Sequence, residues 1–152
     1  RLCRNTIMAL EAERGGSLFL LVQGGRAYRA PLNSSVRPHM QFVRKGDLLS
    51  VARITGSHDN LLQLRLSTNV VASPVVECLP ARRSLNREAL DLSKVLAAVI
   101  EGLAAVNQEL GTSYSATHIC YVPNDSPPET VYGFLAMSLV RHLASGGKFV
   151  EA

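Results

Sequence analysis

His118 and Cys120 are the first candidates for chemistry in this chain, because they stand two residues apart in an apolar segment. If that segment is a strand, both side chains point to one face, where an imidazole and a thiol could bind a metal or act as a nucleophile pair. No third ligand and no orienting carboxylate comes with a recognisable spacing. We therefore interpret Cys120 as a core cysteine beside a half-buried histidine, and a small enzyme built on this pair is the weaker alternative.

Other catalytic arrangements have less support in the sequence. Asp125, Ser126 and His142 could form a hydrolase set, but no Gly-x-Ser-x-Gly elbow surrounds the serine, whose position suits a helix cap. The chain has neither a Gly-x4-Gly-Lys-Ser/Thr phosphate loop nor a Gly-x-Gly-x-x-Gly turn. We expect no catalytic residue, no enzyme activity, no metal, no cofactor and no small-molecule substrate.

Basic residues on a predicted hairpin offer a different chemistry. The apolar segment Leu18–Gln23 is followed by Gly24-Gly25 and then by Arg26, Tyr28 and Arg29. Two glycines between two strand-like segments predict a tight turn, because glycine adopts positive φ at little cost. Arginines that flank an aromatic side chain on such a hairpin suit a phosphate backbone. We predict RNA contact here, and the alternative is that both arginines are only solvated.

The predicted RNA-binding surface continues along the first half of the chain. Its members are the hairpin residues and the basic residues of the following segments: Arg26, Tyr28, Arg29, Arg44, Lys45, Arg53, Arg65, Arg82 and Arg83. Runs of charge are often merely solvated, so each residue outside the hairpin is weak evidence by itself.

The distribution of charge also favours an anionic partner for the first half. The net charge of the chain is +4, but residues 1–87 hold thirteen of the sixteen Lys and Arg and five of the twelve Asp and Glu, a net +8. Residues 88–152 carry a net −4. This asymmetry indicates nucleic acid as the partner of the first half, although arginines that only solubilise a small β-domain would give the same count. Aromatic residues make up only 5% of the chain, too few for a base-stacking platform.

Composition excludes several classes of protein. Apolar residues make up 47% of the 152 residues, which is too many for a disordered chain. Cys3, Cys78 and Cys120 are odd in number and far apart, so we expect a reducing compartment instead of a disulfide framework. No apolar run reaches the roughly 18 residues of a membrane span, so we expect no membrane partner. The chain starts at Arg1, and an organellar presequence is one candidate for what precedes it.

Short strands separated by turn residues are predicted for the first half. The expected strands are Leu18–Gln23, Ala27–Pro31, Asp47–Ile54, Leu61–Ser67 and Pro74–Leu79. Leu62, Leu64 and Leu66 alternate with polar residues, which is the period of a half-buried strand. Five such strands suggest a small antiparallel β-barrel or sandwich.

The second half has a helical period. Apolar residues from Leu92 to Leu110 fall at helical spacing, with Asp91 as the expected N-cap and Gly111 just past the end. Tyr114–Val122 reads as a strand, and Ser126-Pro127-Pro128-Glu129 as the start of a second helix that ends at Gly146-Gly147. We expect the two helices to pack on each other and across that strand, with Leu103 and Phe134 buried.

The glycine-rich hairpin also carries a family resemblance. Gly24-Gly25, Tyr28-Arg29 and Gly46-Asp47 occur at an interval that resembles the start of the twenty-first protein family of the bacterial and organellar large ribosomal subunit. Asp47–Val51, Ile54–Ser57 and Ala72–Leu79 resemble later pieces of the same family, in register over about residues 17–83. The resemblance implies a β-domain that binds ribosomal RNA. The family's C-terminal segment rich in Lys and Arg is absent, because the chain from Leu85 onward is apolar and mildly acidic.

Together these features predict an α+β protein. A lead-in of residues 1–16 is expected to precede a β-barrel-like domain of residues 17–83 and a helix–strand–helix extension of residues 84–152. The predicted function is that of a structural component of a large ribosomal subunit, mitochondrial or otherwise organellar. The β-domain would bind ribosomal RNA, and the extension would bind neighbouring ribosomal proteins. The alternatives are a free-standing homodimeric binding or regulatory protein without catalysis, and a cytoplasmic location.

Overall fold

The computed structural model describes residues 21–23, 26–28, 39–55, 58–81 and 87–152, and it divides the chain into two units, residues 1–35 and 36–152. In the first unit, β1 (Leu21–Gln23) pairs antiparallel with β2 (Arg26–Tyr28), and Gln23 lies opposite Arg26. These strands lie on either side of the predicted turn and are shorter than the predicted segments Leu18–Gln23 and Ala27–Pro31. Gly24-Gly25 themselves lie outside the described residues.

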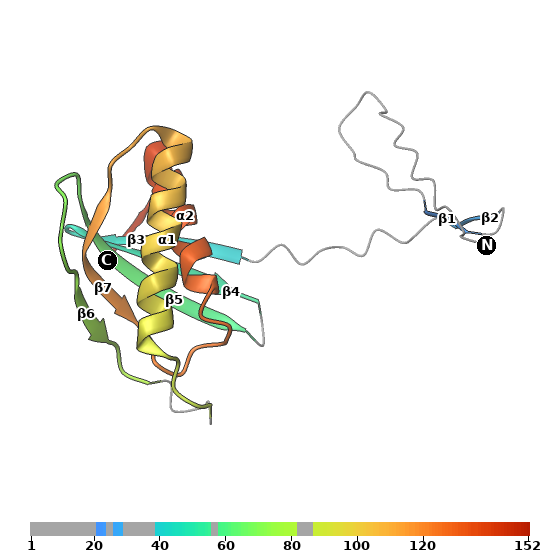
Figure 1. Ribbon diagram of the computed structural model, residues 1–152, viewed down its shortest axis with the longest axis horizontal. Coiled ribbons are helices and arrows are strands. Elements are labelled where there is room, and N and C mark those ends of the chain that lie inside the picture. The colour runs from blue at the N-terminus through green and yellow to red at the C-terminus, as the bar shows by residue number, and fades with distance from the viewer. Residues whose placement is uncertain (1–20, 24–25, 29–38, 56–57, 82–86) are drawn as a thin grey trace. The chain divides into compact units, whose positions relative to one another are not determined.

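The second unit is built on one mixed sheet of six strands (Figure 1). The strands are β3 (His39–Lys45), β4 (Leu48–Ile54), β5 (Asp59–Ser67), β6 (Val75–Cys78), β7 (Ser115–Tyr121) and β8 (Val150–Glu151), in the order β6-β7-β5-β4-β3-β8. Strands β3, β4 and β5 form an antiparallel meander, and β7 continues it antiparallel to β5. The two outer strands are parallel to their neighbours, β6 to β7 and β8 to β3.

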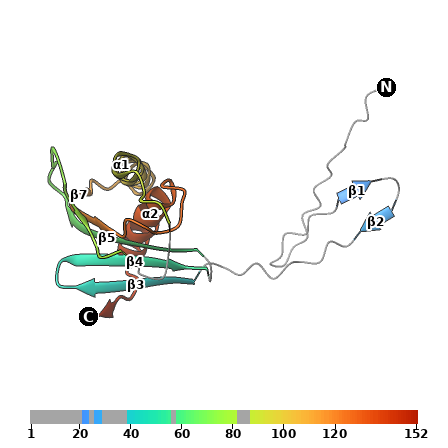
Figure 2. The ribbon, with the colours of Figure 1, turned by 90° about the horizontal axis from the view of Figure 1, so that it is seen from below.

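Two helices cover one face of this sheet (Figure 2). The helix α1 (Leu92–Leu110) has Asp91 as its N-cap, which accepts hydrogen bonds from the backbone N–H groups of Ser93 and Lys94. It ends at Gly111, where φ is +64°, the left-handed conformation that glycine adopts most easily. The helix α2 (Val131–Ala144) follows β7. The core lies between helices and sheet, where Leu62, Leu64 and Ile119 are fully buried, as the alternation in β5 predicts.

The helices approach each other closely where a glycine of one faces the backbone of the other. A Cβ on Gly133 of α2 would lie 2.7 Å from the carbonyl oxygen of Ala98, and one on Gly102 of α1 would meet the backbone of Gly133. Both glycines are buried. Their lack of a side chain therefore sets the distance between α1 and α2.

The predicted α+β class is confirmed, but the described strands β3 to β8 form one open sheet instead of a closed barrel. The predicted division into residues 17–83 and 84–152 is corrected, because β7 and β8 from the second half lie in the same sheet as β3 to β6. Strands β3 and β8 were not predicted. This arrangement depends on strand pairing between segments far apart in the sequence. Local periodicity does not predict such pairing.

The start of α2 also differs from the prediction. Ser126 is buried and lies five residues before the helix, whose N-cap position is Thr130. Leu103 is buried as expected, but Phe134 is 47% exposed, so the prediction of its burial is wrong. Phe134 lies on α2 one residue past Gly133, at the edge of the contact between the two helices. Apolar spacing alone does not distinguish a residue at this edge from one on the buried face of the helix.

Candidate functional site

The predicted RNA-binding residues do not form one surface in the structure. Arg26 and Tyr28 lie on β2 in the first unit, and Arg29, Arg82 and Arg83 lie outside the described residues. The other four are divided between the two faces of the sheet. Arg44 and Arg53 share the helix-covered face with Leu49 and Val51, whereas Lys45 and Arg65 share the opposite face with Leu48.

Two of these four side chains are engaged within the fold. The Nε of Arg65 lies 2.7 Å from Oδ2 of Asp47, and its Nη1 lies 3.4 Å from Nδ1 of His118. The guanidinium of Arg44 lies 4.8 Å from the ring centre of Phe149, a cation–π distance. Both arginines therefore have local partners that explain their positions.

The division into units also changes the charge argument. Residues 36–152 contain eleven Lys and Arg and ten Asp and Glu, a net charge of +1, whereas residues 1–35 contain five and two, a net +3. The boundary between the basic residues 1–87 and the acidic residues 88–152 therefore runs through a single sheet and does not separate two domains. The unit of residues 36–152 as a whole has a net charge close to zero.

His118 and Cys120 do lie on one face of β7, as predicted from their spacing, on the side away from the helices. Burial raises the pKa of the Cys120 thiol above its ordinary value, and Glu77 on the neighbouring strand β6 adds to the effect. A thiol is a poor nucleophile when its thiolate is disfavoured. Within the described residues, no cluster of three or more His, Cys, Asp or Glu side chains could hold a metal ion. No described helix is long and apolar enough to span a membrane.

The most developed polar arrangement is a buried network at the end of the sheet where β4 turns into β5. Oδ2 of Asp125 accepts hydrogen bonds from the backbone N–H of Leu61 at 2.7 Å and from the hydroxyl of Tyr132 at 3.0 Å. Asn60 donates from Nδ2 to the carbonyl oxygen of Ser126 at 2.7 Å. Asn60, Asp125, Ser126 and Tyr132 are all at most 1% exposed. This network fastens the segment between β7 and α2 to strand β5.

A pocket with a volume of about 490 Å³ adjoins the network, and three separate segments line it. Its lining residues are His58, Arg87, Glu88, Ala89, Leu90, Pro127 and Glu129. Arg87 donates from Nη1 to the hydroxyl of Ser126, so the network also positions the guanidinium. Sequence reasoning missed this pocket, because it gave Arg87 no role and assigned Ser126 to a helix cap. Only the meeting of residues 58–60, 87–91 and 123–129 creates it.

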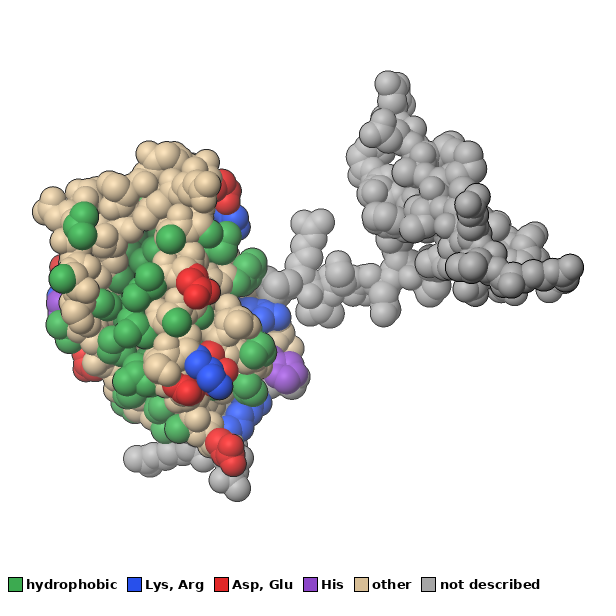
Figure 3. All heavy atoms as spheres, in the orientation of Figure 1, with side chains coloured by type: hydrophobic (Ala, Val, Ile, Leu, Met, Phe, Trp, Pro, Cys, Tyr) green, Lys and Arg blue, Asp and Glu red, His purple; other side chains and the backbone are tan. Residues whose placement is uncertain are grey.

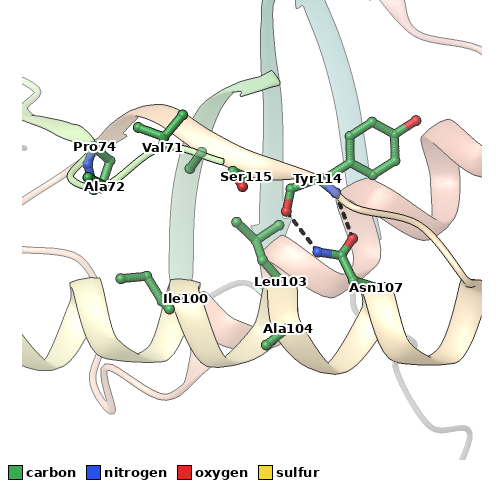
Figure 4. Close-up of a pocket in the computed structure, with 10 residues that line it drawn as sticks. Val71, Ala72, Pro74, Ile100, Leu103, Ala104, Asn107, Tyr114 and Ser115 are labelled. Atoms are coloured by element: carbon green, nitrogen blue, oxygen red, sulfur yellow. Dashed lines mark hydrogen bonds between the residues drawn. The ribbon is translucent and has the colours of Figure 1, made fainter. Parts of the chain in front are cut away.

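A second concave region is an apolar groove between α1 and the segment that leads into β6. Ile100, Leu103 and Ala104 of α1 face Val71 and Pro74, and no charged residue lines the groove (Figure 4). Its volume is about 330 Å³. Asn107 closes one end, but its amide is already used: Nδ2 donates to the carbonyl oxygen of Tyr114, and Oδ1 accepts from the N–H of Tyr114 and the hydroxyl of Thr112. Asn107 therefore shapes the groove and supports the turn after α1.

Exposed apolar side chains adjoin this groove. Ile100, which lines it, is 49% exposed, and Val70, the neighbour of the lining residue Val71, is 95% exposed. Val75 is 57% exposed, but it pairs with His118 and therefore lies on the face of the sheet away from the helices. Viewed from the α1 side, hydrophobic side chains gather over this part of the molecule, with few charged ones among them (Figure 3). Strand β6 has no partner on its outer side among the described strands. We refer to Val70, Ile100 and the groove lining together as the apolar surface.

Comparison with known proteins adds no relative to these observations. No family model matches the chain, and neither a curated protein nor a solved structure does so.

Proposed function

We propose that this protein is a non-catalytic binding component of a larger assembly, and that its unit of residues 36–152 contacts another protein. The observation that carries the proposal is the apolar surface along α1 and the segment before β6, where Val70 and Ile100 are about half or more exposed. An exposed apolar groove beside an unpaired strand edge is typical of a docking surface. The nearly neutral charge of residues 36–152 is consistent with a protein partner.

The assembly we propose first is a large ribosomal subunit, as the resemblance implies. The antiparallel pairing of β1 with β2 supports this part, because the basic residue Arg26 belongs to the paired strand β2. RNA contact is then the role of the first unit and of Arg82 and Arg83, and the sheet is not the main RNA-binding element. Lys45 and Arg65 on the open face would contribute secondarily.

Co-sedimentation tests the ribosomal part of the proposal. The full chain, expressed in its natural host cell with an affinity tag, should sediment with large ribosomal subunits at low salt and leave them as the salt concentration rises. Sedimentation only as a small free species would reject the ribosomal assignment. Docking is tested separately by a photocrosslinker placed at position 100 or 70, which should give a defined protein adduct. A chain that yields no adduct there would reject docking by this surface.

A homodimer is the second candidate, and the 47% exposed Phe134 on α2 favours it. A dimer through the helix layer would bury Phe134 together with Ile100. Sedimentation equilibrium of the purified chain distinguishes the two, because a dimer dissociates on dilution and Phe134→Ser would shift it to monomer. A monomer over the whole accessible concentration range would eliminate this candidate.

A further inference from the structure

The pocket of about 490 Å³ next to the buried network is in the size range of small-molecule sites. Its walls come from the turn before β5, the lead-in to α1 and the segment before α2, represented by His58, Arg87 and Glu129. These segments are distant in sequence. The pocket is therefore a product of the tertiary fold, and it shares no lining residue with the apolar surface.

Hydrogen bonds within the protein hold the walls of the pocket in place before a ligand binds. The N–H of Leu90 donates to the carbonyl oxygen of Pro123 at 2.8 Å, and the N–H of Asp91 donates to Oε1 of Glu129 at 3.1 Å. Behind them, Asn60 donates to the backbone carbonyl of Ser126, and Tyr132 donates to the side-chain carboxylate of Asp125. A pocket whose walls are fixed in this way loses little conformational entropy when a ligand binds.

The charged groups of the lining have opposite signs. Arg87 is positioned by the hydroxyl of Ser126, and its guanidinium is permanently charged. Hydrogen bonds from its own backbone N–H and from the N–H of Asp91 lower the pKa of Glu129, so this carboxylate is ionised at neutral pH. Glu88 adds a second carboxylate at the exposed rim. A ligand with only one charge would face a like charge on one wall.

The remaining wall is apolar. Ala89, Leu90 and Pro127 line the space between the charged groups, and Leu90 is 9% exposed. Hydrocarbon in the ligand would be removed from water against this wall. We propose that the pocket binds a small zwitterion of the free α-amino-acid class, with its carboxylate toward Arg87, its ammonium toward Glu129 and Glu88, and an aliphatic side chain against Leu90 and Pro127. The proposal is independent of the docking function, because the two surfaces share no residue.

Three matched probes test this on the full chain by NMR titration. L-leucine carries both charges, 4-methylpentanoate lacks the ammonium, and 3-methylbutylamine lacks the carboxylate. Leucine should shift the amide resonances of Ala89, Leu90 and Glu129 to saturation. Each single-charge probe should bind at least about tenfold more weakly, since one charge-assisted hydrogen bond is removed. No saturable shift with leucine, equal binding of all three probes, or shifts confined to other residues would overturn the proposal.

A charge-neutral variant adds an independent check. Glu129→Gln keeps an acceptor for the N–H of Asp91 but removes the negative charge, so leucine should bind about tenfold more weakly while 4-methylpentanoate binds no worse. Glu101→Gln, on the exposed side of α1 outside this lining, is the matched control and should leave both affinities unchanged. Equal effects of the two variants, or none from Glu129→Gln, would also overturn the proposal. The comparison of the three probes on the wild-type chain still tests the proposal if a variant fails to fold.

Discussion

The hydroxyl of Tyr132 donates a hydrogen bond to Oδ2 of Asp125 at 3.0 Å, and both residues have no exposed surface. The same carboxylate oxygen accepts the N–H of Leu61 in β5 at 2.7 Å. One carboxylate therefore joins helix α2, the segment that precedes it and the sheet. Because a buried carboxylate is costly without partners, this linkage is a point where small changes should have large effects.

Removing the Tyr132 hydroxyl should destabilise the fold. Tyr132→Phe keeps the ring but takes one hydrogen bond from a buried carboxylate, so we expect a loss of about 1.5 to 3 kcal/mol in the free energy of unfolding. Urea denaturation measures it. Tyr114→Phe, at a half-buried position outside the network, should cost less than about 0.5 kcal/mol. Equal costs at both positions would mean that the Asp125 linkage is not a stabilising element.

Stability should decrease at alkaline pH because of two buried phenols. Burial raises the pKa of Tyr121 to about 12, and burial followed by the Asp125 carboxylate raises the pKa of Tyr132 further above its ordinary value of 10. The folded state thus favours the neutral phenols. Their contribution is complete below pH 10 and decreases as the pH rises through about 12.

Tyrosinate absorbance followed together with unfolding checks this pH dependence. We expect part of the tyrosine absorbance change to be delayed beyond pH 10 and the free energy of unfolding to decrease over the same range. Tyr121→Phe should make that decrease shallower. Ionisation of all four tyrosines near pH 10 in a protein that stays folded would contradict it.

The contact between the two helices should not tolerate a methyl group. Gly133→Ala places a Cβ 2.7 Å from the carbonyl oxygen of Ala98, so α1 and α2 must separate, at an expected cost of about 1 to 3 kcal/mol. Ala104→Ser, on the exposed side of α1, is the control and should change the melting temperature little. An unchanged melting temperature for Gly133→Ala would show that the helices can separate freely.

Asn107 should be necessary for the turn from α1 into β7. Its amide makes three hydrogen bonds, to both backbone groups of Tyr114 and to the hydroxyl of Thr112. Asn107→Ala leaves those groups without their partner, and we expect a loss of about 1 to 3 kcal/mol in denaturant unfolding. Gln108→Ala, on the exposed neighbouring position, should be nearly neutral. If the two variants are equally stable, solvent replaces the amide without cost.

The proposed RNA affinity should reside outside the six-stranded sheet. Replacing Arg26 and Arg29 together with Ala should weaken RNA binding and reduce its salt dependence, by about 0.7 to 0.9 log units of slope for each phosphate that is no longer neutralised. Replacing Lys94 and Lys148, which lie in the acidic second half, should change neither. Filter binding at several salt concentrations gives both slopes. Equal losses of affinity from both pairs would show that the charge asymmetry between the two halves of the chain is incidental to RNA binding.

Several local elements of this protein, such as β5 and α1, follow from its sequence alone. The alternation of Leu62 and Leu64 predicted strand β5, and the carboxylate of Asp91 and the glycine at position 111 marked both ends of α1 within one residue. These features depend on interactions between residues a few positions apart, such as a side chain that caps a nearby N–H. The pairing of β1 with β2 belongs to the same group, because the two strands are separated by only two residues in the sequence.

The arrangement of these elements emerged only in the folded chain. Strand β7 lies between β6 and β5, so residues 75–78 and 115–121 became neighbours although helix α1 separates them in the chain. That pairing joins the two predicted domains into one sheet, in which Arg44 and Arg65 lie on opposite faces. Arg87 and Glu129 likewise share a pocket only because their segments meet beside Ser126. Contacts between distant segments depend on the packing of the whole core, and no local pattern of residues encodes them.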